Sequence, residues 1–423
     1  MRLTIVTLGS RGAVQPYVAL GLGLRAAGHD VTIASYAASR DLVCRHGLGF
    51  APVASNPEEL TACERGGRWL VSSGNPLRSL RRLREVIQPT LGRMVADCRD
   101  ACRDADAILY STLGWLAAAH VAEAQRLPAV AAFLQPVHPT RAFPAIVFPQ
   151  RLGVSGAANR WSYRAAEGLF WRVLRPALDA ARADILGLPP MRGRLPFAQP
   201  ASDERPVLYG FSPAVLPPPP DWGSGVHVTG AWFLEDGESW SPPPDLEAFL
   251  AAGPPPVYIG FGSMRWGNPE RWRDLVVAAV ERIGVRAVIQ TGWGLADGRF
   301  PATVTAVAAA PHDRLFPLVS AVVHHGGGGT TGAGLRAGRP TVTVPFFADQ
   351  PFWGWRVARL GAGPPPVPRR RLSVRRLASA IDAATGNPTV RRRAAQLGDR
   401  IQSENGVERA VDVLEAWLRR VCG

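Results

Sequence analysis

The sequence contains no lysine, so arginine supplies the positive side-chain charge of the chain apart from histidine. With 48 basic and 34 acidic residues, the formal net charge is +14. Such a basic balance raises the question of nucleic-acid binding. The arginines are dispersed, however, in short groups such as Arg369 to Arg371, and no recognisable nucleic-acid module accompanies them. We therefore expect no nucleic-acid partner and at most a weak peripheral attraction to anionic membrane surfaces.

Cysteine is scarce, and the spacings of thiol-based sites are missing. The chain has five cysteines, an odd number, and no C-x-x-C pair. This pattern predicts neither a disulfide framework nor a zinc site. The stretch Asp104-Ala105-Asp106 directly precedes an apolar segment, which is typical of a solvated turn rather than of a metal-binding motif. We expect no metal and no cofactor.

Long apolar runs are also missing. No run approaches the ~20 residues needed to span a bilayer. Met1-Arg2 leads directly into a short apolar segment, without the pattern of a signal peptide. These observations predict a cytoplasmic protein. A length of 423 residues and a hydrophobic fraction of 47% fit two folded domains, each large enough to bury its own core.

Short apolar segments alternate with helical patterns in two series. Strands are predicted at residues 3–8, 31–35, 107–110 and 129–133, and again from residue 257 and at 287–290, 321–323 and 341–345. This alternation favours two α/β domains with parallel, doubly wound sheets. The proline-rich stretch from Pro217 to Gly225 indicates a linker between them. We predict domains at 1–216 and 229–400, a linker at 217–228 and a C-terminal helix within 401–423.

One stretch carries most of the chemical information, the run from His324 to Thr331, which reads HHGGGGTT. It follows the apolar residues 321–323 and precedes a predicted helix. A strand, a glycine turn and a helix N-terminus form an anion site, because free backbone N–H groups and the helix dipole point at the bound group. Imidazole and hydroxyl groups add side-chain donors. This pattern predicts a phosphate-binding site.

Together with the segment Pro345 to Trp353, this run resembles the donor-binding motif of family-one glycosyltransferases, above all bacterial natural-product and sterol glucosyltransferases. Three further segments agree in order: Gly9 to Pro16, Tyr258 to Met264 and Pro311 to Phe316. The resemblance implies the GT-B fold, two Rossmann-like domains facing each other across a cleft. It further implies that the N-terminal domain binds the acceptor, that the C-terminal domain binds the nucleotide sugar, and that the last helix packs back on the N-terminal domain.

The same resemblance implies the reaction: inverting, metal-independent transfer of a hexose from UDP- or dTDP-hexose to a small hydrophobic acceptor. The acceptor would be a natural-product aglycone or a sterol-like alcohol. Matched to the family motif, the donor-binding residues are Ser263, His312, His325, Gly327, Gly328, Gly329, Thr330, Asp349 and Gln350. His325, Thr330 and the glycines would hold the phosphates, and Asp349 and Gln350 the sugar hydroxyls. His312 would lie near the base. Ser263 would donate to a phosphate or, alternatively, cap a helix.

The acceptor side is read less directly. Aromatic residues crowd positions 133–171, and Phe133, Phe143 and Trp161 are our acceptor-binding candidates. At helical spacing such residues also form cores, so both interpretations stay open. In relatives this region shapes an apolar acceptor site, and the stretch 61–76 is a candidate loop over it.

One position departs from the family pattern. The loop Gly-Ser-Arg-Gly-x-Val-Gln-Pro usually has aspartate at x, which acts as the catalytic base or supports one, whereas this chain has Ala13. An alanine accepts no proton. Three explanations compete: an engineered removal of the base, a replacement base with His138 as the leading candidate, or an acceptor that is already nucleophilic. Ala13 also motivates an alternative function, a catalytically idle scaffold that binds a nucleotide sugar.

Overall fold

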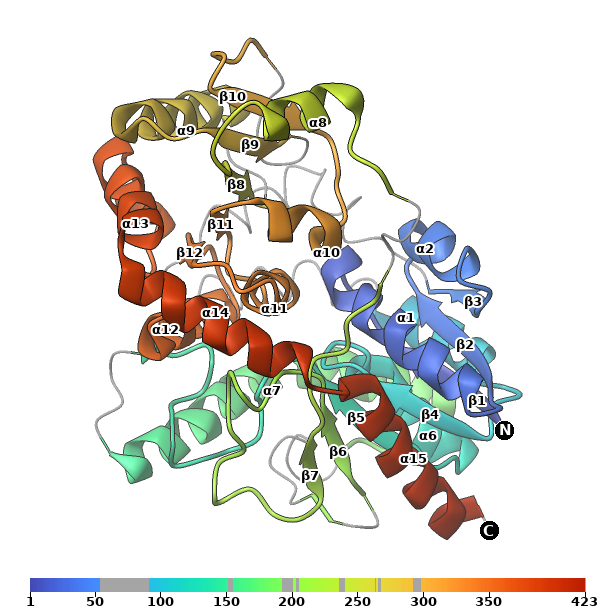
Figure 1. Ribbon diagram of the computed structural model, residues 1–423. Coiled ribbons are helices and arrows are strands. Elements are labelled where there is room, and N and C mark those ends of the chain that lie inside the picture. The colour runs from blue at the N-terminus through green and yellow to red at the C-terminus, as the bar shows by residue number, and fades with distance from the viewer. Residues whose placement is uncertain are drawn as a thin grey trace. The chain divides into compact units, whose positions relative to one another are not determined.

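A computed structural model describes residues 1–53, 91–150, 155–191, 201–202, 205–235, 240–262, 264, 268–291 and 298–422. Ser263 and the candidate loop at 61–76 lie outside the described residues. The chain forms two compact units (Figure 1). The first comprises Met1–Pro213, Pro217–Leu234 and Asn405–Gly423, and the second comprises Ala214–Leu216 and Glu235–Glu404.

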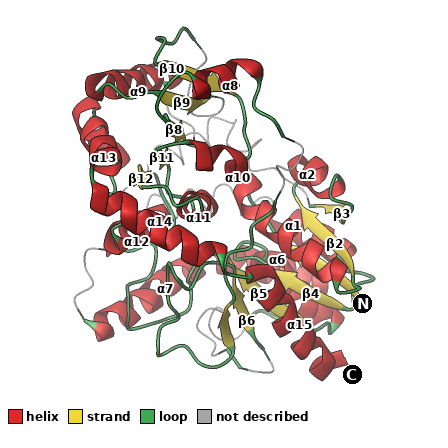
Figure 2. Cartoon of the chain, viewed as in Figure 1, coloured by secondary structure: helices red, strands yellow, loops and turns green. Residues whose placement is uncertain are grey.

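Seven parallel strands form the sheet of the first unit, in the order β3-β2-β1-β4-β5-β6-β7. Figure 2 shows these strands in yellow, with helices in red around them. The elements are β1 Arg2–Val6, α1 Arg11–Ala26, β2 Asp30–Ser35, α2 Arg40–Cys44, β3 Gly49–Pro52, β4 Ala107–Tyr110, α6 Trp115–Gln125, β5 Ala129–Phe133, α7 Gly156–Leu186, β6 Val207–Tyr209, β7 Val226–Val228 and α15 Gly406–Cys422.

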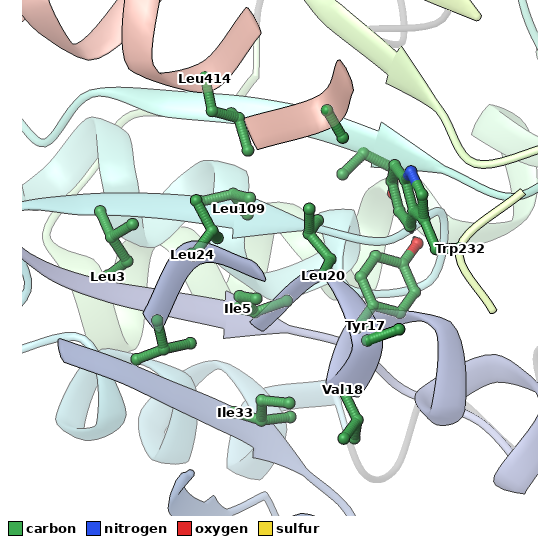
Figure 3. Close-up of a cluster of buried hydrophobic side chains, with 14 of the residues drawn as sticks. Leu3, Ile5, Tyr17, Val18, Leu20, Leu24, Ile33, Leu109, Trp232 and Leu414 are labelled. Carbon is green, nitrogen blue, oxygen red and sulfur yellow. Dashed lines mark hydrogen bonds between the residues drawn. The ribbon is translucent and has the colours of Figure 1, made fainter. Parts of the chain in front are cut away.

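The core of the first unit joins the two ends of the chain (Figure 3). Leu20 and Leu24 of α1 pack with Leu414 of α15 and with the buried side chains of β1, β2 and β4. Tyr17 meets Trp232 edge to face, with ring centroids 5.7 Å apart. The C-terminal helix thus completes the core of the N-terminal unit, because its apolar stripe packs into the same cluster as α1 and the strands.

Five parallel strands form the sheet of the second unit, in the order β10-β9-β8-β11-β12. The elements are α8 Pro244–Ala251, β8 Val257–Gly260, α9 Pro269–Ile283, β9 Ala287–Gln290, β10 Val304–Val307, α10 His312–Leu315, β11 Ala321–His324, α11 Gly328–Arg336, β12 Thr341–Thr343, α12 Gln350–Leu360, α13 Val374–Gly386 and α14 Pro388–Gln402.

Local sequence signals set the helix boundaries. Asn268 caps α9 by accepting a hydrogen bond from the Arg271 N–H, with Pro269 at the first helical position. Gly284 ends that helix at φ 65°, a conformation that glycine adopts without strain. Asn387 and Pro388 begin α14 in the same way.

The predicted strands and the final helix are confirmed, and one expectation needs correction. Residues 217–228 were predicted to be a linker, but Val226–Val228 form β7, the edge strand of the first sheet, paired with β6. The proline run ends at Pro220, and beyond Gly225 the β-branched valines pair as an ordinary strand. The first unit accordingly continues to Leu234.

Candidate functional site

In the second unit, the topology marks one edge of the sheet. The chain runs from β8 to β9 and β10 on one side, and β11 and β12 lie on the other, so the strand order reverses between β8 and β11. Ligands of open α/β sheets bind beyond the carboxyl ends of the strands at such a reversal. Gly260 ends β8 and pairs in register with His324, which ends β11. The loops that follow these two residues therefore form the candidate site.

A glycine turn leads from β11 into α11. Gly326 has φ 92°, and an added Cβ at Gly327 would lie only 2.5 Å from the His325 Nε2, so this close approach requires glycine. Thr331 donates through its N–H and its Oγ1 to the Gly327 carbonyl, at 2.9 Å each. The helix begins at Gly328, and the first N–H groups of a helix have no partner within it. This terminus presents donors and the positive end of the helix dipole.

His325 lies against this terminus. Its ring is near Gly262 of the β8 loop, where an added Cβ would be 3.3 Å from the His325 Cε1. Its Nδ1 is buried and has no hydrogen-bond partner among the described residues. Burial lowers the pKa of His325 to about 4, so the ring is neutral near pH 7. A buried ring nitrogen without a partner, next to a helix N-terminus, fits a bound anion.

His324 has a different role from its neighbour. It is fully buried, and its Nδ1 accepts a hydrogen bond of 2.9 Å from the Gly326 N–H. Burial lowers the pKa of His324 well below the ordinary value, so this ring is also neutral. His324 therefore holds the shape of the glycine turn.

The loop after β12 carries Asp349 and Gln350 to the same edge. An added Cβ at Gly326 would lie 2.9 Å from the Gln350 carbonyl oxygen, which shows how closely this loop approaches the glycine turn. Ala348 has φ 55°, a conformation that costs an L-residue energy and that turns the chain just before Asp349. The Asp349 Oδ2 accepts a hydrogen bond of 2.8 Å from the Trp353 indole N–H. Burial raises the pKa of the Asp349 carboxyl to about 6.

The Gln350 side chain is engaged within its own loop. Its Oε1 accepts hydrogen bonds from the N–H groups of Phe346 and Phe347, at 2.8 and 3.2 Å, and its Nε2 lies 3.5 Å from the Met264 sulfur. The amide oxygen thus satisfies two backbone donors of the turn. The sugar contact predicted for Gln350 stays a prediction, whereas the structure gives this residue a role in holding the loop.

Gln350→Ala should therefore destabilise the second unit. Losing the amide oxygen leaves backbone donors without their partner, which costs about 1–3 kcal/mol of unfolding free energy. Chemical denaturation would measure the loss. Gln402→Ala is the matched control, because Gln402 is exposed and its amide donates to the Arg336 carbonyl instead of accepting from backbone N–H groups. Equal stability of the two variants would contradict the loop-holding role of Gln350.

His312 occupies the first position of α10, after Pro311. Its ring stacks on Phe316, with centroids 4.3 Å apart and an interplanar angle of 15°. It also meets Tyr258 of β8 edge to face, at 6.0 Å. The Tyr258 hydroxyl in turn donates to the Gln290 Oε1 at 2.5 Å. His312 is therefore packed against its own helix turn and the sheet, and the predicted contact with a nucleotide base stays a prediction.

In the first unit, the parallel strands bring three loops to one edge. Ala13 lies in the first turn of α1, after β1, and its carbonyl accepts a hydrogen bond from the Thr7 Oγ1 at 2.9 Å. The loops after β4 and β5 touch, because the Thr112 Oγ1 donates to the Gln135 Oε1 at 3.0 Å. Gly9 has φ 149°, and an added Cβ there would lie 2.6 Å from the Ala13 Cβ. The loop thus approaches Ala13 closely.

His138 lies in the β5 loop, inside a cluster of aromatic rings. It is buried, and its Nδ1 is 2.6 Å from the hydroxyl of Tyr209, the last residue of β6. Trp222 stacks on Tyr209, with centroids 5.0 Å apart. Burial lowers the pKa of His138 to about 4.

Two of the three acceptor candidates are buried and the third is exposed. Phe133 and Phe143 are buried in or beside the aromatic cluster, Phe133 against Tyr209 at 6.1 Å and Phe143 against Trp222 at 6.5 Å. Trp161 is 63% exposed on α7. The packing of Phe133 and Phe143 favours the core interpretation for these two residues.

Sequence reasoning missed several residues of these two edges. Tyr209, Trp222 and Trp353 were not singled out, although each contacts a residue that was. The sequence contained slight signals for two of them. Tyr209 ends the short apolar run 207–209, and Trp222 follows the four prolines 217–220 and Asp221. Their importance follows from contacts between segments distant in sequence.

No group of three or more His, Cys, Asp and Glu side chains in the described ranges is arranged to hold a metal ion. No helix in the described part of the chain has both the length and the apolar character needed to cross a membrane.

Comparison with known proteins agrees with the geometry. Residues 3–144 match the glycosyltransferase family 28 N-terminal domain, and residues 277–416 match the erythromycin biosynthesis protein CIII-like C-terminal domain. The sterol 3-beta-glucosyltransferase of Emericella nidulans is 38% identical over 98% of this chain and 30% of its own length. That of Cryptococcus neoformans is 37% identical over 98% of this chain and 27% of its own length. The chain thus spans less than a third of the length of these curated relatives.

Solved structures show the same fold. The calicheamicin glycosyltransferase CalG4 superposes with a TM-score of 0.67 at 20% identity, over 100% of this chain and 99% of that one. The glycosyltransferase VinC, in complex with dTDP, superposes with a TM-score of 0.66 at 19% identity, over 99% and 100%. The chain thus has an N-terminal part similar to the glycosyltransferase family 28 N-terminal domain, a C-terminal part similar to the erythromycin biosynthesis protein CIII-like domain, and the fold of GT-B glycosyltransferases.

Proposed function

We propose that the chain transfers a hexose from UDP- or dTDP-hexose to the hydroxyl of a small hydrophobic acceptor, with inversion at the anomeric carbon. The observation that carries this proposal is the anion site of the second unit. There, the unpartnered Nδ1 of His325, the N-terminus of α11 and the Asp349 carboxyl lie at the edge where β8 and β11 end. A diphosphate needs hydrogen-bond donors, and a hydroxylated sugar ring next to it needs an acceptor such as a carboxylate.

The donor half of the reaction follows from these groups. As the bond from C1 to the diphosphate breaks, negative charge grows on the leaving phosphate. The N–H groups at the start of α11 and the His325 ring stabilise that charge without moving, because the glycine turn already fixes them. Asp349, held by Trp353, accepts hydrogen bonds from sugar hydroxyls and orients the ring for attack.

The proposed acceptor follows from the names of similar proteins and from the first sheet. The curated relatives are named for sterols, and the solved neighbours include enzymes named for natural products. The carboxyl edge of the first sheet combines aromatic rings with the polar loops of Ala13 and His138, which suits an apolar molecule with one reacting hydroxyl. We therefore propose a sterol-like alcohol or a polycyclic aglycone as the acceptor.

One observation favours a second function. Ala13 occupies the position at which family members usually carry aspartate, so the chain would bind a nucleotide sugar without turning it over. In that case the protein is a scaffold. Binding is common to both functions, and only product formation separates them.

The test combines thermal unfolding with product analysis. We expect UDP- or dTDP-glucose to raise the unfolding temperature, and mass spectrometry to detect a hexosylated product with a sterol or aglycone panel. Stabilisation without any product from the panel would favour the scaffold. No stabilisation by any of these nucleotides would refute both functions.

Asp349 variants test the sugar contact in the same assay. Asp349→Ala should lower affinity for the nucleotide sugar about ten- to hundredfold, since a hydrogen bond to a charged group is worth about 1.5–3 kcal/mol. Affinity for the free nucleotide should not change. Asp349→Asn is the matched control, because an amide oxygen still accepts the Trp353 hydrogen bond. Equal losses for nucleotide and nucleotide sugar in both variants would show that Asp349 only shapes the loop.

A further inference from the structure

The hydroxyl of Tyr209 makes three contacts, which together fix the state of the His138 ring. It accepts hydrogen bonds from the Val137 N–H at 3.1 Å and from the His138 N–H at 3.0 Å. The third contact, at 2.6 Å, is to the His138 Nδ1. A phenolic oxygen has two lone pairs and one proton. The two backbone donors use both lone pairs, so the third contact must use the Tyr209 proton.

Tyr209 has that proton to give. Its side chain is fully buried at the end of β6, and burial raises the pKa of the hydroxyl above its ordinary value. The group is therefore a phenol and not a phenolate near pH 7. Trp222 stacked on one face and Phe133 beside it keep the ring in place. The Tyr209 hydroxyl consequently donates to the His138 Nδ1.

The consequence concerns the other nitrogen of the imidazole. A neutral histidine carries one proton, and when Nδ1 accepts a hydrogen bond that proton resides on Nε2. Burial of His138 disfavours the charged ring near pH 7. Neither nitrogen is then available to take a proton, since Nδ1 is engaged by a hydroxyl and Nε2 already bears hydrogen.

We propose that Tyr209 locks His138 in the Nε2-protonated form, so that His138 serves the acceptor site as a hydrogen-bond donor and not as the base. Tyr209 is the positioning residue, acting from the next strand of the sheet. The Nε2–H would hold the acceptor oxygen through one lone pair while the other attacks the anomeric carbon. The bond from C1 to the diphosphate breaks, and the hydroxyl proton passes to water or to the departing diphosphate and not to His138. This functional part rests on the proposed glycosyl transfer, whereas the lock itself does not.

Nitrogen-15 NMR of the full chain with labelled histidines tests the lock without any substrate. We expect the His138 ring, assigned by its loss in His138→Gln, to show Nε2 protonated and Nδ1 unprotonated at pH 7. Tyr209→Phe should replace this single form by a mixture of tautomers. If that variant does not fold, the spectrum of the parent chain still decides. A proton on Nδ1, or a charged ring, at pH 7 would overturn the proposal.

Activity then separates donor from base. The amide of glutamine can place an N–H near the Nε2 position but cannot accept a proton at neutral pH. We expect His138→Gln to keep turnover within about tenfold of the parent, while His138→Ala loses more than His138→Gln. A base would give a loss of about 10²–10⁴-fold in both variants, and that result would overturn the donor role. Absence of product in the parent chain would instead refute the proposed transfer and leave the NMR result standing.

Discussion

Ala13→Asp is expected to raise turnover at least tenfold, with little change in nucleotide affinity. General-base help is typically worth about 10²–10⁴-fold, so tenfold is a conservative floor. Ala13 is the third residue of α1, half-buried, and its loop lies at the carboxyl edge of the first sheet. An aspartate there sits at a helix N-terminus, where the dipole favours the ionised form. A carboxylate would therefore be present at neutral pH to accept the proton of an alcohol.

Ala13→Asn is the matched control, because the amide has nearly the same size but accepts no proton. Steady-state rates are measured for the parent and for both variants, and only Ala13→Asp should be faster than the parent. Its rate should fall at acidic pH as the new carboxylate becomes protonated. The aspartate should also add about 0.3–1 kcal/mol to stability through the helix dipole, so stability has to be measured alongside the rates.

Other outcomes distinguish the explanations for Ala13. An equal rise in both variants would point to size or hydrogen bonding and not to proton transfer. If Ala13→Asp leaves the rate unchanged while His138→Ala and His138→Gln both abolish it, the base lies on the His138 loop, and the donor role of His138 is wrong as well. If neither substitution matters and the parent turns over well, the acceptor supplies its own nucleophile.

His325→Ala is expected to weaken nucleotide-sugar binding by about ten- to hundredfold. The lost hydrogen bond to a charged phosphate is worth about 1.5–3 kcal/mol, and each 1.4 kcal/mol is a factor of ten in affinity. Folding should change little, because the His325 Nδ1 has no partner within the described residues. Calorimetric titration with UDP- and dTDP-sugars would measure the loss. Unchanged affinity in a well-folded variant would refute the assignment.

The pH dependence of binding provides a second readout. The pKa of His325 is about 4 in the free protein, and a bound diphosphate would raise it, since an anion favours the charged ring. The Asp349 carboxyl, with a pKa of about 6, titrates in the same range, so the effect is measured in Asp349→Asn, where affinity should increase as pH falls from about 7 to 5. Both phosphates of a nucleotide sugar are diesters that do not titrate in this range, so the ligand adds no such trend. In that background, His325→Gln keeps an N–H donor, and we expect it to retain part of the affinity but to lose this pH dependence.

The same pKa has the opposite effect on stability. A histidine whose folded-state pKa lies below its unfolded value of about 6.5 opposes folding as pH falls. His138 and His120 share this direction, each with a pKa lowered to about 4 by burial. The free chain should thus become less stable below about pH 6.5 while the contribution of His325 to nucleotide-sugar affinity increases. The binding experiment needs thermal unfolding at each pH to keep the two effects apart.

Much of the fold was predictable from the sequence, because local residue patterns encode it. Short apolar runs such as residues 107–110 and 287–290 favour buried strands because of their length, and both are strands in the structure. Asn268-Pro269 and Gly284 mark the two ends of α9 for equally local reasons. The glycine run after His324 predicts a turn into a helix, and in the structure Gly326 and Gly327 form that turn before α11. The anion expected at this helix N-terminus stays a prediction.

The tertiary structure alone decided which partner each polar group meets. Tyr209 lies 71 residues beyond His138, and the two meet only because β5 and β6 are neighbours in the sheet. The sequence was compatible with a hydrogen bond from a sugar hydroxyl to the Gln350 side-chain oxygen. In the folded chain this oxygen accepts hydrogen bonds from two backbone N–H groups of its own loop. Residues 226–228 follow a linker-like proline run and still pair with β6 as an edge strand. In each case the deciding contact depends on strand order and loop closure, and a local pattern specifies conformation and burial but not the identity of a distant partner.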